Sequence, residues 1–122
     1  MYVMLTQKLS KGFKSWKDMV HENEHKLEGF KGRVIFAGSH AEDDNSMVVI
    51  MHYDDKEGLM AFKNDEELTK ARQEAGALTE TTVMTVMTEA ALLNFPNYNF
   101  NWLQVEMNYL LCSQFQSINQ VL

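Results

Sequence analysis

The order of the apolar runs is the feature that most restricts the fold of this chain. Four short runs rich in apolar and β-branched residues are separated by two stretches with helical spacing, in the order β-α-β-β-α-β. The expected strands are residues 2–9, 33–40, 47–53 and 79–89. Because only a polar turn separates the second and third strands, an antiparallel hairpin is expected there. This order predicts an α+β, ferredoxin-like fold with a four-stranded antiparallel sheet.

Both connecting stretches are expected to be helical. In the first, residues 13–30, large apolar side chains recur at spacings of three, four and seven residues, which predicts one helix with a single buried face. The second, residues 54–76, begins with Asp54 and Glu57 at the spacing of a capping box. The pair Asn64-Asp65 resembles a second helix start, so a break or a kink is expected there. The apolar residues of the first stretch are Phe13, Trp16, Val20 and Leu27.

Both faces of the predicted sheet are apolar. An antiparallel sheet with helices on one face normally alternates apolar and polar residues, and these strands do not. Because an exposed apolar patch of several hundred square ångströms is unusual in a monomer, a second copy of the chain or its own C-terminal segment is expected to cover the face without helices. The opposed sets are Val34 and Phe36 against Ile35 and Ala37, Met47, Val49, Met51 and Tyr53 against Val48 and Ile50, and Val83 and Met87 against Met84 and Val86.

The composition changes near Glu89. All eleven Lys and Arg residues lie before residue 73, and Glu106 is the one charged residue among residues 90–122. We therefore predict a ferredoxin-like domain over residues 1–89 and an apolar, charge-poor extension over residues 90–122. Approximate helical spacing in the extension favours an amphipathic helix that packs on its own domain or on a second copy. A helix at a membrane surface and a poorly ordered segment are the alternatives.

Short motifs in the helical stretches carry a resemblance to a known superfamily. Over residues 1–89 the chain resembles the dimeric α+β barrel superfamily, to which the antibiotic-biosynthesis-monooxygenase-like domains belong. More narrowly, it is similar to small cyanobacterial proteins of this type whose function is unassigned. The motifs are Phe13-x-x-Trp16, Tyr53-Asp54-Asp55-x-Glu57-Gly58-Leu59-x-x-Phe62, Asp65-x-Glu67-Leu68 and Glu74-Ala75-Gly76.

The resemblance implies a dimeric α+β barrel, in which the partner is a second copy bound through the sheet face. The superfamily contains cofactor-free monooxygenases and haem-degrading oxygenases. The haem-degrading members use an Asn on the first strand, together with a Trp and a His of the second helical region. Here the first strand has Thr6 and Gln7, and residues 56–76 contain no histidine. Haem is therefore not expected, and neither is another cofactor.

A ligand pocket is expected to involve Tyr2, Trp16, His52 and Tyr53. His52 and Tyr53 are candidates for a catalytic role, because an imidazole between apolar strands can act as an acid or a base near neutral pH. His40 ends the second strand, and in a hairpin it could approach His52. The alternative is that both histidines lie at strand ends, where the backbone or water satisfies them.

The segment His21 to His25, HENEH, has the H-E-x-x-H spacing of zinc proteases. On a helical wheel both histidines point sideways and outward from the apolar stripe, and Glu22 points away from the core. A catalytic zinc needs three protein ligands in a sheltered site, and no third ligand is evident. The segment is interpreted as a solvated helix face, and no metal site is expected.

Charge and hydropathy argue against several classes of partner. The net charge is -6, with no basic cluster suited to nucleic acid or to an anionic membrane. No apolar run approaches the roughly 20 residues that span a bilayer, and no signal peptide is visible. The single cysteine, Cys112, cannot form an internal disulfide, which is compatible with the cytoplasm.

Two functions are consistent with these patterns. The favoured one is a non-catalytic domain that binds a small apolar ligand or serves in assembly. The alternative is a cofactor-free monooxygenase or isomerase of the dimeric α+β barrel type. A binding domain should have a pocket without convergent polar groups, whereas an enzyme should place His52 or a tyrosine in a closed cavity with a perturbed pKa.

Overall fold

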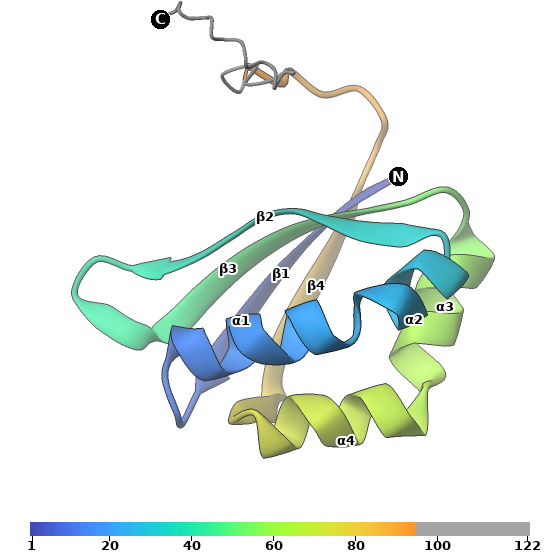
Figure 1. Cartoon of the computed structure of the whole chain (residues 1–122). Coiled ribbons are helices and arrows are strands. Elements are labelled where there is room, and N and C mark those ends of the chain that lie inside the picture. The colour runs from blue at the N-terminus through green and yellow to red at the C-terminus, as the bar shows by residue number, and fades with distance from the viewer. Residues whose placement is uncertain (95–122) are drawn as a thin grey trace, which may run out of the picture. The chain divides into compact units, whose positions relative to one another are not determined.

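The computed structural model describes residues 1–94 (Figure 1). All strand pairs are antiparallel, in the sheet order β2-β3-β1-β4. The predicted α+β, ferredoxin-like fold with a four-stranded antiparallel sheet is confirmed. The elements are β1 (Tyr2–Leu9), α1 (Phe13–Glu22), α2 (Glu24–Gly29), β2 (Gly32–His40), β3 (Asp43–Tyr53), α3 (Lys56–Asn64), α4 (Glu66–Glu74) and β4 (Ala77–Met87).

Residues Met1–Ala90 form one compact unit. The helix predicted for the C-terminal extension lies outside the described residues, and the division into residues 1–89 and 90–122 remains a prediction. No helix within residues 1–94 is long and apolar enough to cross a membrane.

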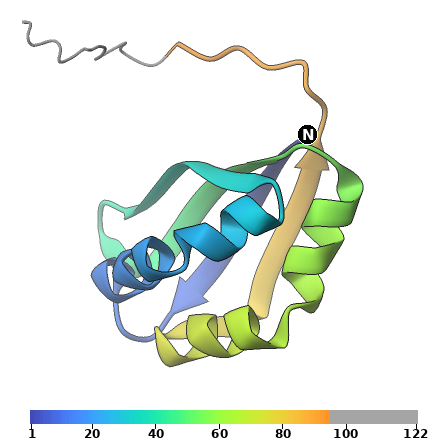
Figure 2. The same cartoon turned by 45° about the vertical axis from the view of Figure 1, so that its right-hand side comes forward.

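The helices cover one face of the sheet, as both views of the fold show (Figure 1, Figure 2). Along β1, Val3, Leu5 and Leu9 are buried on the helix side, because alternate residues of a strand point to the same face. The core forms between this side of the sheet and the helices. Its buried members are Val3, Leu5, Leu9, Trp16, Met19, Leu27, Met47, Val49, Met51, Tyr53, Leu59, Phe62, Leu68, Ala75 and Ala77.

The other face of the sheet is also apolar, as predicted. Partners in an antiparallel pair point to the same side, so Met4 shares this face with Ile50, and Thr6 shares it with Val48 and Val83. No helix or strand of the unit Met1–Ala90 lies on this side of the sheet (Figure 1). We call it the open face; its apolar residues are Met4, Phe36, Val48, Ile50, Val83 and Met87.

The first helical stretch is divided, and the prediction of one helix over residues 13–30 is wrong. α1 ends at Glu22 and α2 begins at Glu24. Between them the side-chain amide of Asn23 donates a hydrogen bond of 2.8 Å to the carbonyl oxygen of Met19. Asparagine side chains form such local hydrogen bonds with the backbone, and these bonds compete with a continuous helix. The spacing of the apolar residues gives no sign of this break.

The break at Asp65 in the second helical stretch is confirmed. The Asp65 carboxylate accepts a hydrogen bond of 3.0 Å from the backbone N–H of Leu68, which caps α4. The start of the stretch differs from the prediction by one residue. Asp55, not Asp54, is the N-cap of α3, and it accepts a bond of 2.8 Å from the N–H of Gly58.

The β2-β3 hairpin is tighter than the sequence predicts. β3 begins at Asp43, so the connection is shorter than the polar turn expected over residues 41–46. His40 pairs with Asp43 at the closed end of the hairpin, whereas His52 pairs with Arg33 near the other end. The two histidines therefore do not approach each other, and the alternative that each lies near a strand end describes their positions.

A β-bulge changes the faces of β2. The register shifts between Val34 and Phe36, so Val34 lies opposite Met51 on the helix side and Phe36 lies opposite Ile50 on the open face. Strict alternation would have put Val34 and Phe36 on the same face of the sheet. The additional residue in the bulge, Ile35, breaks the alternation, and it places a large aromatic side chain on the open face.

Candidate functional site

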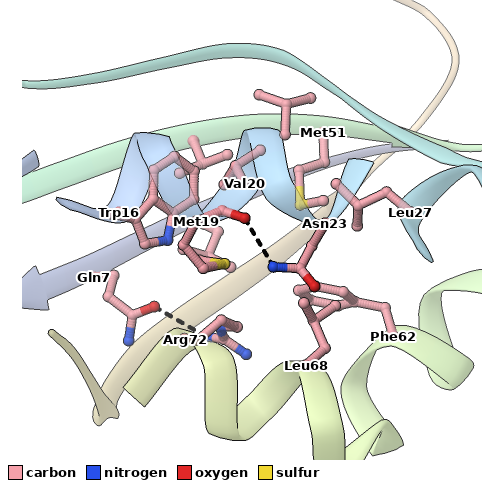
Figure 3. Close-up of a pocket in the computed structure, with 13 residues that line it drawn as sticks. Gln7, Trp16, Met19, Val20, Asn23, Leu27, Met51, Phe62, Leu68 and Arg72 are labelled. Atoms are coloured by element: carbon pink, nitrogen blue, oxygen red, sulfur yellow. Dashed lines mark hydrogen bonds between the residues drawn. The ribbon is translucent and has the colours of Figure 1, made fainter. Parts of the chain in front are cut away.

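A small cavity lies between the helices and the sheet (Figure 3). Its volume is about 30 Å³, which is room for about one water molecule. Most of its wall is apolar, and it is built from β1, β2, β3 and the four helices. The lining residues are Leu5, Gln7, Trp16, Met19, Val20, Asn23, Leu27, Val34, Val49, Met51, Phe62, Leu68 and Arg72.

Arg72 is the one charged residue in this lining. It comes from α4 and is only 9% exposed. Its Nη2 donates to the side-chain oxygen of Gln7 at 3.0 Å and to Thr82 Oγ1 at 3.4 Å. The guanidinium carbon also lies 5.5 Å from the centre of the Phe62 ring, close enough for a cation–π attraction.

Gln7 holds the arginine in place. Its amide nitrogen donates to the carbonyl oxygen of Leu78 at 3.0 Å and also to Thr82 Oγ1. This leaves the amide oxygen directed at Arg72 (Figure 3). Gln7 is buried on the helix side of β1, between Leu5 and Leu9 along the strand. The strand and the start of β4 therefore fix the orientation of a polar group at the cavity wall.

Burial lowers the pKa of the Arg72 guanidinium, although the neighbouring Tyr53 acts in the opposite direction. Arginine nevertheless keeps its charge in proteins. No Asp or Glu within residues 1–94 forms an ion pair with Arg72. The cavity therefore has a positive charge at its wall that only neutral groups compensate.

A second polar cluster lies on the open face, around His52. Nε2 of His52 lies 3.0 Å and 2.9 Å from the two carboxylate oxygens of Glu89. The Tyr2 ring meets the imidazole edge-on, with the ring centres 4.8 Å apart. His52 Nδ1 is fully buried and makes no hydrogen bond within the described residues. Its nearest acidic neighbour is Asp54, with an oxygen at 3.9 Å.

The Glu89 carboxylate belongs to the same cluster. The hydrogen bond to His52 and then the one to the α-amino group of Met1 lower the pKa of Glu89 to about 2. The α-amino nitrogen lies 2.6 Å from Glu89 Oε2. Because the Glu89 side chain is 65% exposed, solvent screens these interactions in part.

Tyr53 is fully buried on the helix side of β3. Burial raises the pKa of its hydroxyl, while the nearby Arg72 lowers it. The hydroxyl lies 3.9 Å from the sulfur of Met51, and Tyr53 does not line the cavity. Its position makes it a core residue with a neutral hydroxyl.

The four residues expected to form a pocket do not line one cavity. Trp16 lines the cavity on the helix side, whereas Tyr2 and His52 meet on the open face. His52 and Tyr53 are consecutive in a strand, so they necessarily point to opposite faces. No histidine or tyrosine among residues 1–94 lines the cavity.

Sequence reasoning missed Gln7 and Arg72. Each carries a recognisable signal, since a polar residue occupies a position on an otherwise apolar face. Gln7 alternates with Leu5 and Leu9, and Arg72 lies four residues after Leu68 on the buried side of α4. The signal identifies a buried polar residue, but it does not show that the two side chains meet.

The HENEH segment forms no metal site in the part of the chain that the structure describes. His21 lies in α1 and His25 in α2, on either side of the break at Asn23. Both histidines are exposed, and so is Glu22. No group of three or more His, Cys, Asp or Glu residues within residues 1–94 is arranged to hold a metal ion.

No protein-family model matches the chain, and neither does any curated protein. Solved structures do match. A protein from Agrobacterium tumefaciens has a TM-score of 0.52 at 14% identity, over 73% of this chain and 92% of that chain. This chain has the same ferredoxin-like α+β fold. At this level of identity, the structural similarity establishes the fold alone.

Two further solved structures are similar at lower scores. An antibiotic biosynthesis monooxygenase has a TM-score of 0.49 at 11% identity, over 74% of this chain and 98% of that chain. An uncharacterized NIPSNAP domain protein from Burkholderia xenovorans has a TM-score of 0.42 at 18% identity, over 75% of this chain and 99% of that chain. The narrower similarity to cyanobacterial proteins remains a prediction.

Proposed function

We propose that this domain is a non-catalytic binding module that takes up a small, largely apolar molecule between its helices and its sheet, and that it works as a homodimer. The observation that carries the proposal is the buried cavity, whose wall is apolar except for Gln7, Asn23 and Arg72. Binding sites for small molecules typically combine such a wall with a few fixed polar groups.

The cavity must widen to accept a ligand, because about 30 Å³ is far below the roughly 300 Å³ or more of typical ligand pockets. Two features support such widening. Met19 and Met51 line the cavity, and methionine side chains adapt readily to new shapes. Both helical stretches are broken, at Asn23 and at Asp65, so a short helix can shift without bending a long one.

The composition of the cavity wall favours binding over catalysis. None of the thirteen lining residues is a His, Tyr, Asp, Glu, Cys or Lys. A reaction that begins with proton abstraction needs a general base within hydrogen-bond reach of the substrate. His52, the strongest candidate base in the sequence, lies on the other side of the sheet.

A cofactor-free monooxygenase or isomerase is the second candidate. One observation favours it: Arg72 lies at the cavity wall, where a cation can stabilise an oxygen atom that becomes negative during a reaction. Oxygen uptake with a phenolic probe such as 1-naphthol tests it. The enzyme is favoured over the binding module if the protein raises oxygen uptake above the rate of the probe alone and if Arg72→Gln abolishes this increase.

The open face supports self-association. Phe36 and Val83 on this face are 50% and 58% exposed, and the half-buried Met4, Val48 and Ile50 continue the apolar surface between them. Covering this surface removes apolar area from water, which is the main driving force of association. A second copy presents the same surface, as a symmetric dimer requires.

Native mass spectrometry of the freshly purified protein tests both parts of the proposal. The expected result is a dimer that carries a small molecule, which is released on unfolding. Protein freed of that molecule is then titrated with benzene, cyclohexanol and indole and followed by amide-proton NMR. The chemical-shift changes should be largest at the residues that line the cavity. They should disappear in the variant Leu68→Phe, whose larger side chain fills the cavity. If none of the three probes shifts the lining residues, the binding function is wrong.

A further inference from the structure

Arg72 has no counter-ion within residues 1–94, although the protein is rich in acids. The chain has 17 Asp and Glu residues against 11 Lys and Arg, yet none of those within residues 1–94 lies within 4.0 Å of the Arg72 guanidinium nitrogens. Buried charges are normally paired, because desolvating a lone charge is costly. An uncompensated arginine at a cavity wall therefore points to an anion that the cavity receives.

The guanidinium also keeps free donors. Arginine has five N–H groups, and both hydrogen bonds that Arg72 makes within residues 1–94 come from Nη2. Among these residues, His52 Nδ1 is the fully buried side-chain nitrogen or oxygen that lacks a partner. The other two guanidinium nitrogens of Arg72, Nη1 and Nε, make no hydrogen bond within residues 1–94 and keep their donors for a ligand.

The donors are held in position before any ligand arrives. Gln7 and Thr82 bind one nitrogen, and Phe62 lies against the guanidinium. Gln7 is itself anchored to the Leu78 carbonyl. Groups that are fixed in advance lose little freedom on binding, so more of their interaction appears as affinity.

We propose that the molecule taken up by the cavity carries one carboxylate, which the free edge of the Arg72 guanidinium receives, while its apolar body lies against Trp16, Met19 and Phe62. This inference rests on the proposed binding function. A planar carboxylate matches the arginine fork and can accept two parallel hydrogen bonds. A single negative charge neutralises the single positive one, whereas a phosphate dianion would leave excess charge in an apolar site.

Two matched pairs of probes test the inference: benzoate with benzamide, and cyclohexanecarboxylate with cyclohexanecarboxamide. Each pair shares one apolar ring and differs in charge, so the affinity ratio isolates the contribution of the anion. In amide-proton NMR titrations of the full chain, the acid should bind at least ~10-fold more tightly than its amide. The Nε–H resonance of Arg72 should shift with the acid and stay in place with the amide.

Variants then assign the preference to one side chain. Arg72→Gln should reduce the acid-to-amide ratio to near one, and Arg72→Lys, which keeps the charge, should retain part of the preference. Lys70→Gln is the matched control, because Lys70 is an exposed cation on the same helix; its ratio should equal that of the wild type. If Arg72→Gln does not fold, the wild-type ratio and the Arg72 Nε–H shift decide the question.

The outcomes separate the two proposals. If acid and amide bind equally well, the carboxylate inference is overturned and the binding function stands. If neither member of either pair shifts the cavity residues, and benzene, cyclohexanol and indole do not either, both proposals fall. A preference for the acid that survives Arg72→Gln but disappears in Lys70→Gln overturns the assignment to Arg72.

Discussion

His52 and Glu89 form a contact across three strands of the sheet, with Nε2 only 2.9 Å from Glu89 Oε2. His52 lies on β3, and Glu89 follows the end of β4. Tyr2 on the central strand β1 lies between them, since it pairs with His52 on one side and with Met87 on the other. The contact therefore joins the segment that follows β4 to β3, with β1 lying between these two strands.

Loss of the Glu89 carboxylate is expected to lower stability in a pH-dependent way. The pKa of Glu89 falls from 4.5 to about 2, with the bond to His52 as the largest cause. A carboxylate with a lowered folded pKa stabilises the fold above pH 4.5, and this contribution is lost as the pH falls toward about 2. Glu89→Gln should therefore lower the urea midpoint near neutral pH, and its difference from the wild type should shrink across that range.

Glu80→Gln is the control for this experiment, because Glu80 is an exposed residue of β4 that forms no ion pair within residues 1–94. Its urea midpoint should follow that of the wild type at every pH. If the urea midpoints of Glu89→Gln and the wild type differ by the same amount from neutral pH to pH 2, the charge of Glu89 adds no stability.

A charge on the open face is expected to disrupt the proposed dimer. Phe36→Asp puts a carboxylate on the part of the open face that the edge strand β2 contributes, where burial of an unpaired charge by a second copy is costly. Phe36 is 50% exposed in one copy, so folding of that copy should suffer little. Sedimentation velocity should show a dimer dissociation constant raised by at least ~10-fold, as expected when a large aromatic interface residue is lost.

Met60→Asp is the matched control for self-association, since Met60 is 41% exposed but lies on α3, away from the open face. It should dimerise like the wild type. A wild-type protein that remains monomeric at high concentration, or equal weakening by both substitutions, would contradict association through the open face.

Enlarging the cavity is expected to lower stability and to raise the affinity for larger ligands. Leu68→Ala removes a buried side chain from the cavity wall and should cost about 2–5 kcal/mol in the free energy of unfolding. Leu59→Ala is the control, because Leu59 is equally buried but does not line the cavity. Both variants should be destabilised in urea, and only Leu68→Ala should bind indole more tightly than the wild type does.

Two glycines are expected to respond in opposite ways to alanine. A Cβ at Gly58 would overlap the backbone carbonyl oxygen of Phe30, so Gly58→Ala should cost about 1–3 kcal/mol or more. A Cβ at Gly29 in α2 would meet nothing within 4 Å, and Gly29→Ala should stabilise by about 0.4–1 kcal/mol through the unfolded chain. Urea unfolding of both variants measures the difference; equal effects would refute the predicted close approach of α3 to Phe30.

Much of the fold could be predicted, because periodicity is a local property of the chain. The alternation of short apolar runs and helical spacings predicts the order of the elements and the antiparallel sheet. Asp65 is a strong helix start by its own chemistry, and the break there follows from it. The apolar character of both sheet faces follows from strand alternation, which makes an uncovered face visible without a structure.

The candidate site could not be predicted, because it depends on which elements are neighbours and in which register. Gln7 and Arg72 are 65 residues apart in the chain, and their contact exists because α4 lies over β1. Each of the four expected pocket residues lies in a predicted strand or helical stretch, yet the sheet separates Tyr2 and His52 from Trp16 and Tyr53.

The sequence by itself determined the four strands, the two helical stretches between them and their order, because these depend on residues within a few positions of one another. Only the tertiary structure decided the bulge that turns Phe36 to the open face and the meeting of Arg72 with Gln7. Each of these depends on a hydrogen bond, a register shift or a packing contact whose energy is comparable to the local preferences. Spacing along the chain does not encode them.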